Sequence, residues 1–534
     1  MLIAFGLVAL TALAALWARR WHIPHAILLV LLGLGLSFLP FIPRLELDPN
    51  LVLTLFLPPL LYNAGVGMSW RGFKENLRPI LLLAVGAVIF TAACVAGLMH
   101  FLFGLPLAVG FVLGAVVSPP DAVAPMAIAR RFALPNRILT ILEGEGLVND
   151  ATALILFSFA VAAVTQGQGF SFATASLSFA VIVAGELAWG LAVGWGGLVL
   201  RRWAQETRVE IIFALLTPFV AFWVPHALGG SGVLATVAAG LFVSWNGRRY
   251  ISPATRLQGF FVWDLITYLI EGLIFLLTGL QARIVAETLE LGEWETLAFA
   301  ATAVVVAIIL VRFIWVYLAT WLPRALSPAL QARDPMPNWR YTFMVAFTGI
   351  RGVVSLAAAL SIPLLAGGEP FPERGLLLLV TFAVIVATLV GQGLTLPWVI
   401  RALDLEGDGR REAETAKKRE ITARLASIDA ALARLDTLEG AVSSPDTVAA
   451  LKRRHADRRA YFVAACQDLG GDGAMIGNSA ALQVQFVEAE RASIADLYAR
   501  GEIGDDARRR IERELDLEDS RIRHSAESGA GRMV

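Results

Sequence analysis

The chain has 534 residues, of which 57% are hydrophobic, and its mean hydropathy is +0.67. Globular proteins contain about 45–50% apolar residues, so this composition excludes an ordinary soluble enzyme and indicates a membrane protein with many spans. The 44 basic residues balance the 44 acidic ones, and we expect no nucleic-acid partner. The two cysteines, Cys94 and Cys466, offer neither a disulfide framework nor a metal cluster, so we expect no cofactor and no transition metal.

Thirteen apolar runs are long enough to cross the roughly 30 Å of bilayer hydrocarbon at 1.5 Å per helical residue. They lie at 2–18, 24–42, 51–67, 79–103, 107–128, 139–164, 172–200, 210–227, 232–246, 261–282, 297–322, 341–366 and 375–400. We therefore predict an all-α polytopic membrane protein with about 13 transmembrane helices.

The loops between these runs differ in basic charge. Alternate loops, beginning with the one after the first run, hold 17 Lys and Arg residues, whereas the intervening loops hold 3. Because basic loops stay on the cytoplasmic side, we expect the N-terminus outside and the C-terminus in the cytoplasm. The chain has 40 Arg and 4 Lys, which is typical of a GC-rich genome, and we expect a bacterial plasma membrane.

The composition becomes polar from about Ala402. An amphipathic helical stripe follows, formed by Leu425, Ile428, Leu432, Leu435 and Leu438. We predict two domains: a transmembrane domain at 1–401 and a cytoplasmic, mainly helical C-terminal domain at 402–534.

Two of the runs contain residues that break helices. The fifth run places three prolines around one carboxylate: Pro119, Pro120 and Pro125 around Asp121. The twelfth run places two glycines around one cation: Gly349 and Gly352 around Arg351. Interrupted spans at corresponding positions of two halves point to a transporter binding site. Inverted repeats of helices 1–6 and 8–13 would make the fifth and twelfth helices counterparts.

The sixth run carries acids at membrane depth, where carboxylates relay protons, pair or bind ions. Glu145 and Asn149 are four residues apart and share a helix face, whereas Asp150 is turned roughly 140° from Glu145. We expect Glu145 to pair with Arg351 as a structural ion pair. We expect Asp150 to face Asp121 and form an ion site, where a monovalent cation and a proton compete for the same carboxylate.

Several motifs together resemble the monovalent cation:proton antiporter-1 family, whose bacterial sodium/proton antiporters are related to eukaryotic sodium/proton exchangers. They are EGEGLVND at 143–150, SPPDAVA at 118–124, GIRGVV at 349–354 and EGLIFLLTGLQ at 271–281. The resemblance covers essentially residues 1–400.

The resemblance implies a thirteen-helix inverted-repeat fold, a homodimer, and a core that moves in an elevator-like cycle. It also implies that Asp150 exchanges the cation for the proton, and that Asp121 and the Pro120 backbone carbonyl complete the site. Asn149 beside Asp150 implies electroneutral one-for-one exchange. The partners would be H⁺ and Na⁺, with Li⁺ or K⁺ as further candidates, in the service of pH and cation homeostasis.

Two positions depart from the family's common pattern. Pro120 and Gly146 stand where hydroxyl residues are usual, which removes side-chain oxygens from the site. A potassium/proton antiporter is therefore the nearest alternative. An alternative from another class is a non-transporting membrane sensor that acts through its tail. The sequence leaves the roles of Glu143, Glu186 and Arg312 open, with Arg312 expected to snorkel or pair.

Overall fold

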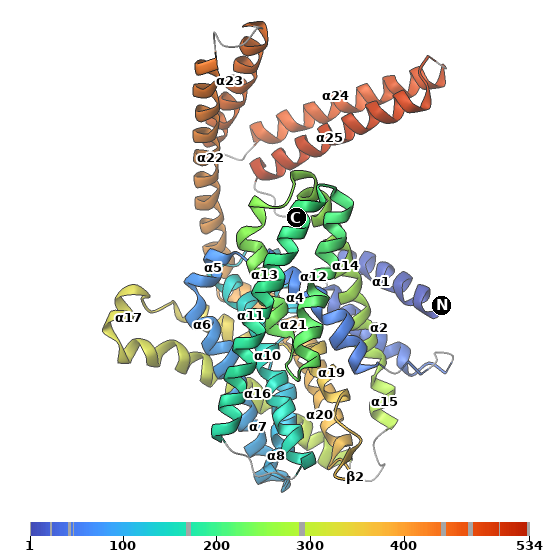
Figure 1. Ribbon diagram of the computed structural model, residues 1–534, viewed down its shortest axis with the longest axis vertical. Helices are drawn as coiled ribbons and strands as arrows, with labels where there is room; N and C mark the ends of the chain where they lie inside the picture. Colours follow the sequence, from blue (N-terminus) through green and yellow to red (C-terminus); the bar gives the residue numbers. More distant parts are fainter. Residues whose placement is uncertain are drawn as a thin grey trace. The chain divides into compact units, whose positions relative to one another are not determined.

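The computed structural model describes residues 2–21, 24–40, 44–45, 47–166, 172–287, 294–438, 445–467, 474–500 and 502–530. These residues are mostly helical (Figure 1). The chain divides into two compact units, Met1–Glu406 and Gly407–Val534, close to the point at which the composition becomes polar.

The first unit is a helical bundle. Its α-helices are α1 (Leu2–Trp21), α2 (His25–Ser37), α3 (Pro49–Leu51), α4 (Leu57–Gly67), α5 (Trp70–Glu75), α6 (Leu77–Leu81), α7 (Val88–Phe103), α8 (Leu107–Val117), α9 (Val123–Arg131), α10 (Asn136–Gln166), α11 (Phe172–Ala204), α12 (Thr207–Ala227), α13 (Val233–Asn246), α14 (Pro253–Leu280), α15 (Ala282–Glu287), α16 (Trp294–Leu326), α17 (Pro328–Arg333), α18 (Trp339–Phe347), α19 (Val353–Leu360), α20 (Arg374–Val386) and α21 (Gly393–Ala402). Three π-helical segments and a 3₁₀ turn connect some of them: η1 (Val52–Phe56), η2 (Leu82–Ala87), η4 (Ala387–Gln392) and η3 (Gly247–Arg249).

The structure supports a multi-span membrane protein. Within the described residues, eight helical stretches are long and apolar enough to cross a bilayer, and three shorter apolar helices accompany them. Each of the thirteen predicted runs overlaps a helix of this unit. Length and composition alone select eight of them, so the count of thirteen and the inverted repeat stay predictions.

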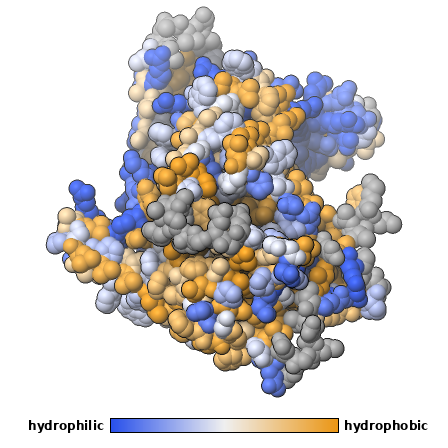
Figure 2. Space-filling view, turned by 60° about the horizontal axis from the view of Figure 1, so that its bottom comes forward, coloured by the Kyte–Doolittle hydropathy of each residue, from blue (hydrophilic) through white to orange (hydrophobic). Residues whose placement is uncertain are grey.

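Large apolar side chains are exposed along several of these helices. Figure 2 shows a broad hydrophobic area on one face of the molecule. Examples of exposed side chains are Leu191 and Trp195 on α11, Phe260 and Phe261 on α14, and Leu310 and Ile314 on α16. Soluble monomers rarely expose apolar patches this wide, so these helices are suited to contact with lipid.

Close helix pairs depend on glycine. A Cβ at Gly33 of α2 or Gly279 of α14 would overlap the backbone of the other helix. Gly110 and Gly114 of α8 lie in the same way against the backbone of α7. Because lipid tails are as apolar as the helices, membrane helices gain stability from such close van der Waals packing.

Both predicted helix breaks are present. The chain is non-helical between the end of α8 at Val117 and the start of α9 at Val123, where Pro119 and Pro120 provide no N–H donors. Pro125 is the third residue of α9, in the first turn, where N–H groups have no helical acceptor in any case.

The second break separates α18 from α19. The chain is non-helical from Thr348 to Gly352. The twelfth run also ends earlier than predicted, because α19 stops at Leu360 and a two-stranded antiparallel hairpin follows: β1 (Leu365–Ala366) and β2 (Glu369–Pro370). Gly367 and Gly368 have positive φ angles, as a tight hairpin turn requires.

The second unit consists of long helices. They are α22 (Leu405–Leu438), which begins just before the division, α23 (Pro445–Gln467), α24 (Ala474–Ala499) and α25 (Asp505–Ala530). A small apolar cluster around Ile421 includes Tyr461 and Phe462, and joins α22 to α23. A second cluster around Val487 and Leu515 joins α24 to α25.

Candidate functional site

The two broken helices meet at their breaks. The Asp121 N–H donates to the Ile350 carbonyl oxygen at 2.7 Å. A Cβ at Gly352 would overlap the Asp121 carboxylate, so the close approach of these two broken segments requires glycine. The crossing gathers four helix ends, from α8, α9, α18 and α19, with their unpaired backbone groups and partial charges.

Two side chains of opposite charge compensate these helix ends. The Asp121 carboxylate accepts from the Val123 N–H at 2.9 Å, at the N-terminus of α9. The Arg351 guanidinium donates to the Val117 carbonyl at 3.0 Å, at the C-terminus of α8, and to the Gly349 carbonyl just beyond α18. An acid at a helix N-terminus and a base at C-termini both match the helix dipoles.

Helix α10 presents Asn149 to the first break. Its side chain is completely buried, and its amide nitrogen donates to the Pro120 carbonyl at 2.6 Å. The Asn149 carbonyl oxygen has no hydrogen-bond partner among the described residues. A carbonyl oxygen has two lone pairs, so the Pro120 oxygen also keeps one for a further partner. Buried unpaired acceptors of this kind are uncommon and suit a bound cation or water.

Asp150 follows on the same helix and is half-buried. Its carboxylate interacts electrostatically with Asp121, and within the described residues no hydrogen bond or ion pair to it is formed. The structure therefore brings Asp121, Asn149 and Asp150 together. Two carboxylates without a protein cation form an oxygen-rich, negatively charged site for a cation or a proton. Among the described residues, no three His, Cys, Asp or Glu side chains cluster as a metal site.

A small cavity lies beside the first break. Its lining residues are Pro120, Asp121, Ala122, Pro125, Leu142, Glu145, Gly146 and Thr348. It leaves about 10 Å³ for the centres of water molecules, on the order of one water. A Cβ at Gly146 would overlap the Ala122 side chain, so close packing of the residue before α9 on α10 leaves no room for a hydroxyl side chain at this position.

The prediction that Glu145 pairs with Arg351 is wrong. Glu145 instead pairs with Arg312 of α16, whose two terminal nitrogens donate to the two carboxylate oxygens at 2.6 and 3.0 Å. Both side chains are at most 3% exposed. The Arg351 guanidinium is engaged by the carbonyls at the helix ends, whereas Arg312 offers the parallel, bidentate geometry that a buried carboxylate needs.

The two other acidic residues whose roles the sequence left unassigned have structural partners. Glu186 is buried and accepts hydrogen bonds from the N–H groups of Ser231, Gly232 and Leu234 at 2.6 to 3.0 Å, at the start of α13. Glu143 pairs with Arg130 at 2.7 Å near the surface. Neither acid is part of the crossing.

Sequence reasoning named no partner for two charged residues near the site. Arg312 carries the ion pair with Glu145. Glu271 of α14 is half-buried and interacts electrostatically with Asp121. Both were recognisable as charges inside apolar runs, where ionisable groups are rare and usually functional or paired.

Residues 6–402 match the protein family described as "Sodium/hydrogen exchanger, transmembrane". Similar proteins include an uncharacterised Na⁺/H⁺ exchanger of Mycobacterium tuberculosis, 33% identical over 542 residues and covering 98% of both chains. A Na⁺/H⁺ antiporter of Aphanothece halophytica is 30% identical over 440 residues, covering 82% of this chain and 79% of its own. A sodium, potassium, lithium and rubidium/H⁺ antiporter of Bacillus subtilis is 34% identical over 420 residues, covering 76% and 62%.

The fold is also similar to a solved structure. The sodium proton antiporter of Methanocaldococcus jannaschii superposes with a TM-score of 0.60 at 19% sequence identity, covering 76% of this chain and 99% of that one. At this identity the similarity supports the fold alone.

Proposed function

The chain belongs to the sodium/hydrogen exchanger family, and from this premise we propose that it exchanges a monovalent cation for protons through a site formed by Asp150 and Asp121. It is a secondary transporter rather than an enzyme. The observation that supports the proposal best is the crossing of two broken helices beside an acid that forms no ion pair with a cation of the described residues.

The coupling follows from competition at one group. Asp150 holds either a proton or a cation, because two neighbouring carboxylates at membrane depth cannot both stay ionised without a positive partner. When the site opens to the side rich in the cation, the cation displaces the proton. When it opens to the other side, a proton displaces the cation. Obligatory exchange needs no further charged group.

Asn149 supports an electroneutral cycle. Its amide is neutral and bound to the Pro120 carbonyl, so it carries no proton through the cycle. One titrating carboxylate, Asp150, then exchanges one proton for one monovalent cation. We propose an elevator-type movement of the core in a homodimer, with the N-terminus outside and the C-terminus in the cytoplasm of a bacterial plasma membrane, as the charge of the loops predicts.

Sodium is the first candidate substrate and potassium the second. Packing at Gly146 leaves no room for a hydroxyl. The Thr348 hydroxyl beside the break donates to the Met344 or Val345 carbonyl, so the carboxylate and amide oxygens at the crossing come from Asp121, Asp150 and Asn149. A site with few fixed oxygens leaves water to complete the shell, which tolerates a larger ion. The Bacillus subtilis relative is named for sodium, potassium, lithium and rubidium, which favours testing each of these ions.

Flux through the purified full-length protein tests the proposal. Proteoliposomes loaded with a pH-sensitive dye receive an outward gradient of Na⁺, Li⁺, K⁺ or choline. We expect protons to move inward as Na⁺ or another alkali ion moves outward, and no proton movement with choline. A membrane potential imposed at fixed ion gradients should leave the rate unchanged if the exchange is electroneutral.

Two other results would indicate a different function. A membrane sensor that acts through its tail would move no protons with any cation. A channel would show flux that neither saturates nor requires an ion on the opposite side. Either result would contradict antiport.

A further inference from the structure

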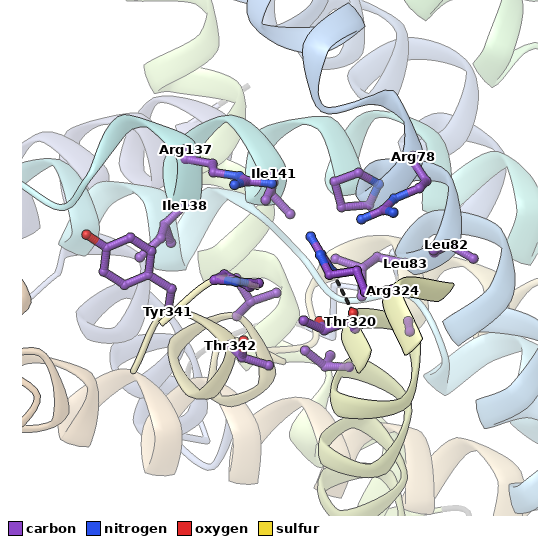
Figure 3. Close-up of a pocket in the computed structure, with 15 residues that line it drawn as sticks. Arg78, Leu82, Leu83, Arg137, Ile138, Ile141, Thr320, Arg324, Tyr341 and Thr342 are labelled. Atoms are coloured by element: carbon purple, nitrogen blue, oxygen red, sulfur yellow. Dashed lines mark hydrogen bonds between the residues drawn. The ribbon is translucent and has the colours of Figure 1, made fainter. Parts of the chain in front are cut away.

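A second charged site lies away from the crossing. It is a pocket between α6, α10, α16 and α18 with room for about 60 Å³ of water-molecule centres, enough for a small polar group. Figure 3 shows three arginines, Arg78, Arg137 and Arg324, that come from three different helices and gather at this pocket. The remaining wall is mainly apolar and includes Leu82, Leu83, Ile138, Ile141, Val316 and Val345.

These three arginines share one carboxylate. Asp334, at the end of α17, accepts from Arg78 at 2.9 Å, from Arg137 at 2.7 Å and from Arg324 at 2.7 Å. Three positive charges against one negative charge leave an excess of two, and no acid is among the described residues that line the pocket. Arg324 is 4% exposed and Arg78 is 29% exposed. A largely buried charge without a counter-charge is costly, so the pocket is suited to an anion.

Free donors point to the same conclusion. The Arg324 side chain is 4% exposed and donates to both the carboxylate and the carbonyl of Asp334. In contrast, one terminal nitrogen of Arg78 is buried without a hydrogen-bond partner among the described residues. Arginine binds phosphate oxygens through two parallel N–H donors, and Arg78 spends only one of its terminal nitrogens on Asp334.

We propose that this pocket binds the phosphate headgroup of an anionic phospholipid, with the acyl chains along the apolar wall. The three arginines lie at the end of the bundle that the loop charges assign to the cytoplasm, where anionic headgroups and basic pockets between helices meet. A free phosphate would use the arginines but leave the apolar wall without a role.

The surroundings of the pocket match the level of lipid headgroups. Two tryptophans, Trp321 next to Thr320 and Trp339 at the start of α18, are each 58% exposed. Leu77 and Leu81, on either side of Arg78 in α6, are exposed as well. Exposed tryptophan beside exposed leucine is typical of the membrane interface. A lipid bound here would join α6, α16 and α18 to the N-terminus of α10, the helix that carries Asp150.

Thermal stability of the purified full-length protein in detergent tests this proposal. We expect added phosphatidylglycerol to raise the melting temperature, and zwitterionic phosphatidylcholine at the same concentration to leave it unchanged. Inorganic phosphate and glycerol phosphate separate the two sources of the headgroup chemistry. Stabilisation by either of them equal to that by phosphatidylglycerol would overturn the lipid assignment.

Two single variants locate the effect. Arg78→Gln and Arg137→Gln should each raise the half-saturating phosphatidylglycerol concentration about fivefold or more, because each arginine near an anionic lipid contributes a factor of this order. Arg71→Gln is the matched control, since Arg71 is 89% exposed on the neighbouring α5 and pairs only with Glu75 among the described residues. Arg137 is 39% exposed, so its variant should fold if the Arg78 variant does not. A wild-type response in the Arg137 variant would overturn the proposal.

Discussion

The surroundings of Glu145 and of Asp150 differ sharply, although both acids lie on α10. Glu145 is 2% exposed and holds Arg312 in a two-bond ion pair. Asp150 is half-buried and lies near the like charge of Asp121, and no hydrogen bond or ion pair to it is formed among the described residues. A buried carboxylate with a fixed partner supports the structure, whereas one without a partner is free to exchange its counter-ion.

Two buried arginines near these acids also differ in what they bind. Arg312 neutralises a side chain, whereas Arg351 neutralises the carbonyl ends of two interrupted helices. Neither cation is directed at Asp150 in the described structure. The arrangement keeps two fixed positive charges close to the crossing and leaves the negative charge of Asp150 for the transported ions.

The largest effect is expected when Asp150 loses its charge. Asp150→Asn should reduce cation-driven proton flux to that of empty liposomes, because the amide can neither bind the proton nor neutralise the cation. The protein should still fold, since no hydrogen bond or ion pair to Asp150 is lost among the described residues. Glu143→Gln is the matched control, an acid of the same helix outside the site, and should retain exchange. Full exchange by the Asp150 variant with every cation tested would show that the site is elsewhere.

Removing Arg312 should affect stability most. Arg312→Ala leaves the Glu145 carboxylate buried without its partner, and loss of one member of such a pair costs about 3–5 kcal/mol. The melting temperature of the solubilised protein should fall strongly, and adding Glu145→Gln should recover much of it. Arg351→Ala should also destabilise, but Glu145→Gln should not rescue it, because Arg351 binds backbone carbonyls. If Glu145→Gln rescued the Arg351 variant and not the Arg312 variant, Glu145 would pair with Arg351 after all.

The sequence predicts the breaks but not the ion pair, for physical reasons. Proline has no N–H and glycine tolerates open backbone, so Pro119, Pro120 and Gly352 mark the interruptions locally. The direction in which Asp150 points relative to Glu145 follows from helix geometry alone. These features need no knowledge of the neighbouring helices.

The partner of Glu145 depends on which helix lies opposite. Arg312 and Arg351 both lie inside apolar runs, and either could reach a buried acid. The choice depends on the position of α16 against α10 and on the carbonyl groups that the breaks expose, which the sequence of α10 does not contain. The sequence does not predict the cluster of arginines around Asp334 for the same reason, since these arginines come from three separate helices.

A smaller effect is expected at the contact between the two breaks. Gly352→Ala places a methyl group on the Asp121 carboxylate. The methyl group should push the two broken segments apart and weaken exchange. Overpacking of this kind costs about 1–3 kcal/mol, so the melting temperature should fall moderately. Gly185→Ala is the control, because a Cβ at Gly185 of α11 meets nothing within 4 Å. Equal flux in both variants would show that the close contact at Gly352 is not needed for transport.

The smallest effect is a pH dependence at Asp334. Burial alone raises the pKa of this carboxyl, but the hydrogen bond from Arg137 and the charges of Arg137, Arg324 and Arg78 together hold the pKa below its ordinary value. A group whose pKa is lower in the folded state stabilises the protein fully above its unfolded pKa, about 3.9, and loses this contribution as the pH falls through the folded value. Asp334→Asn should therefore lower the melting temperature slightly above about pH 4 and progressively less below it. Glu75→Gln, in an exposed pair with Arg71, should change it little at any pH. A difference between the wild type and the Asp334 variant that grows on acidification would mean that the arginines do not stabilise the charged carboxylate.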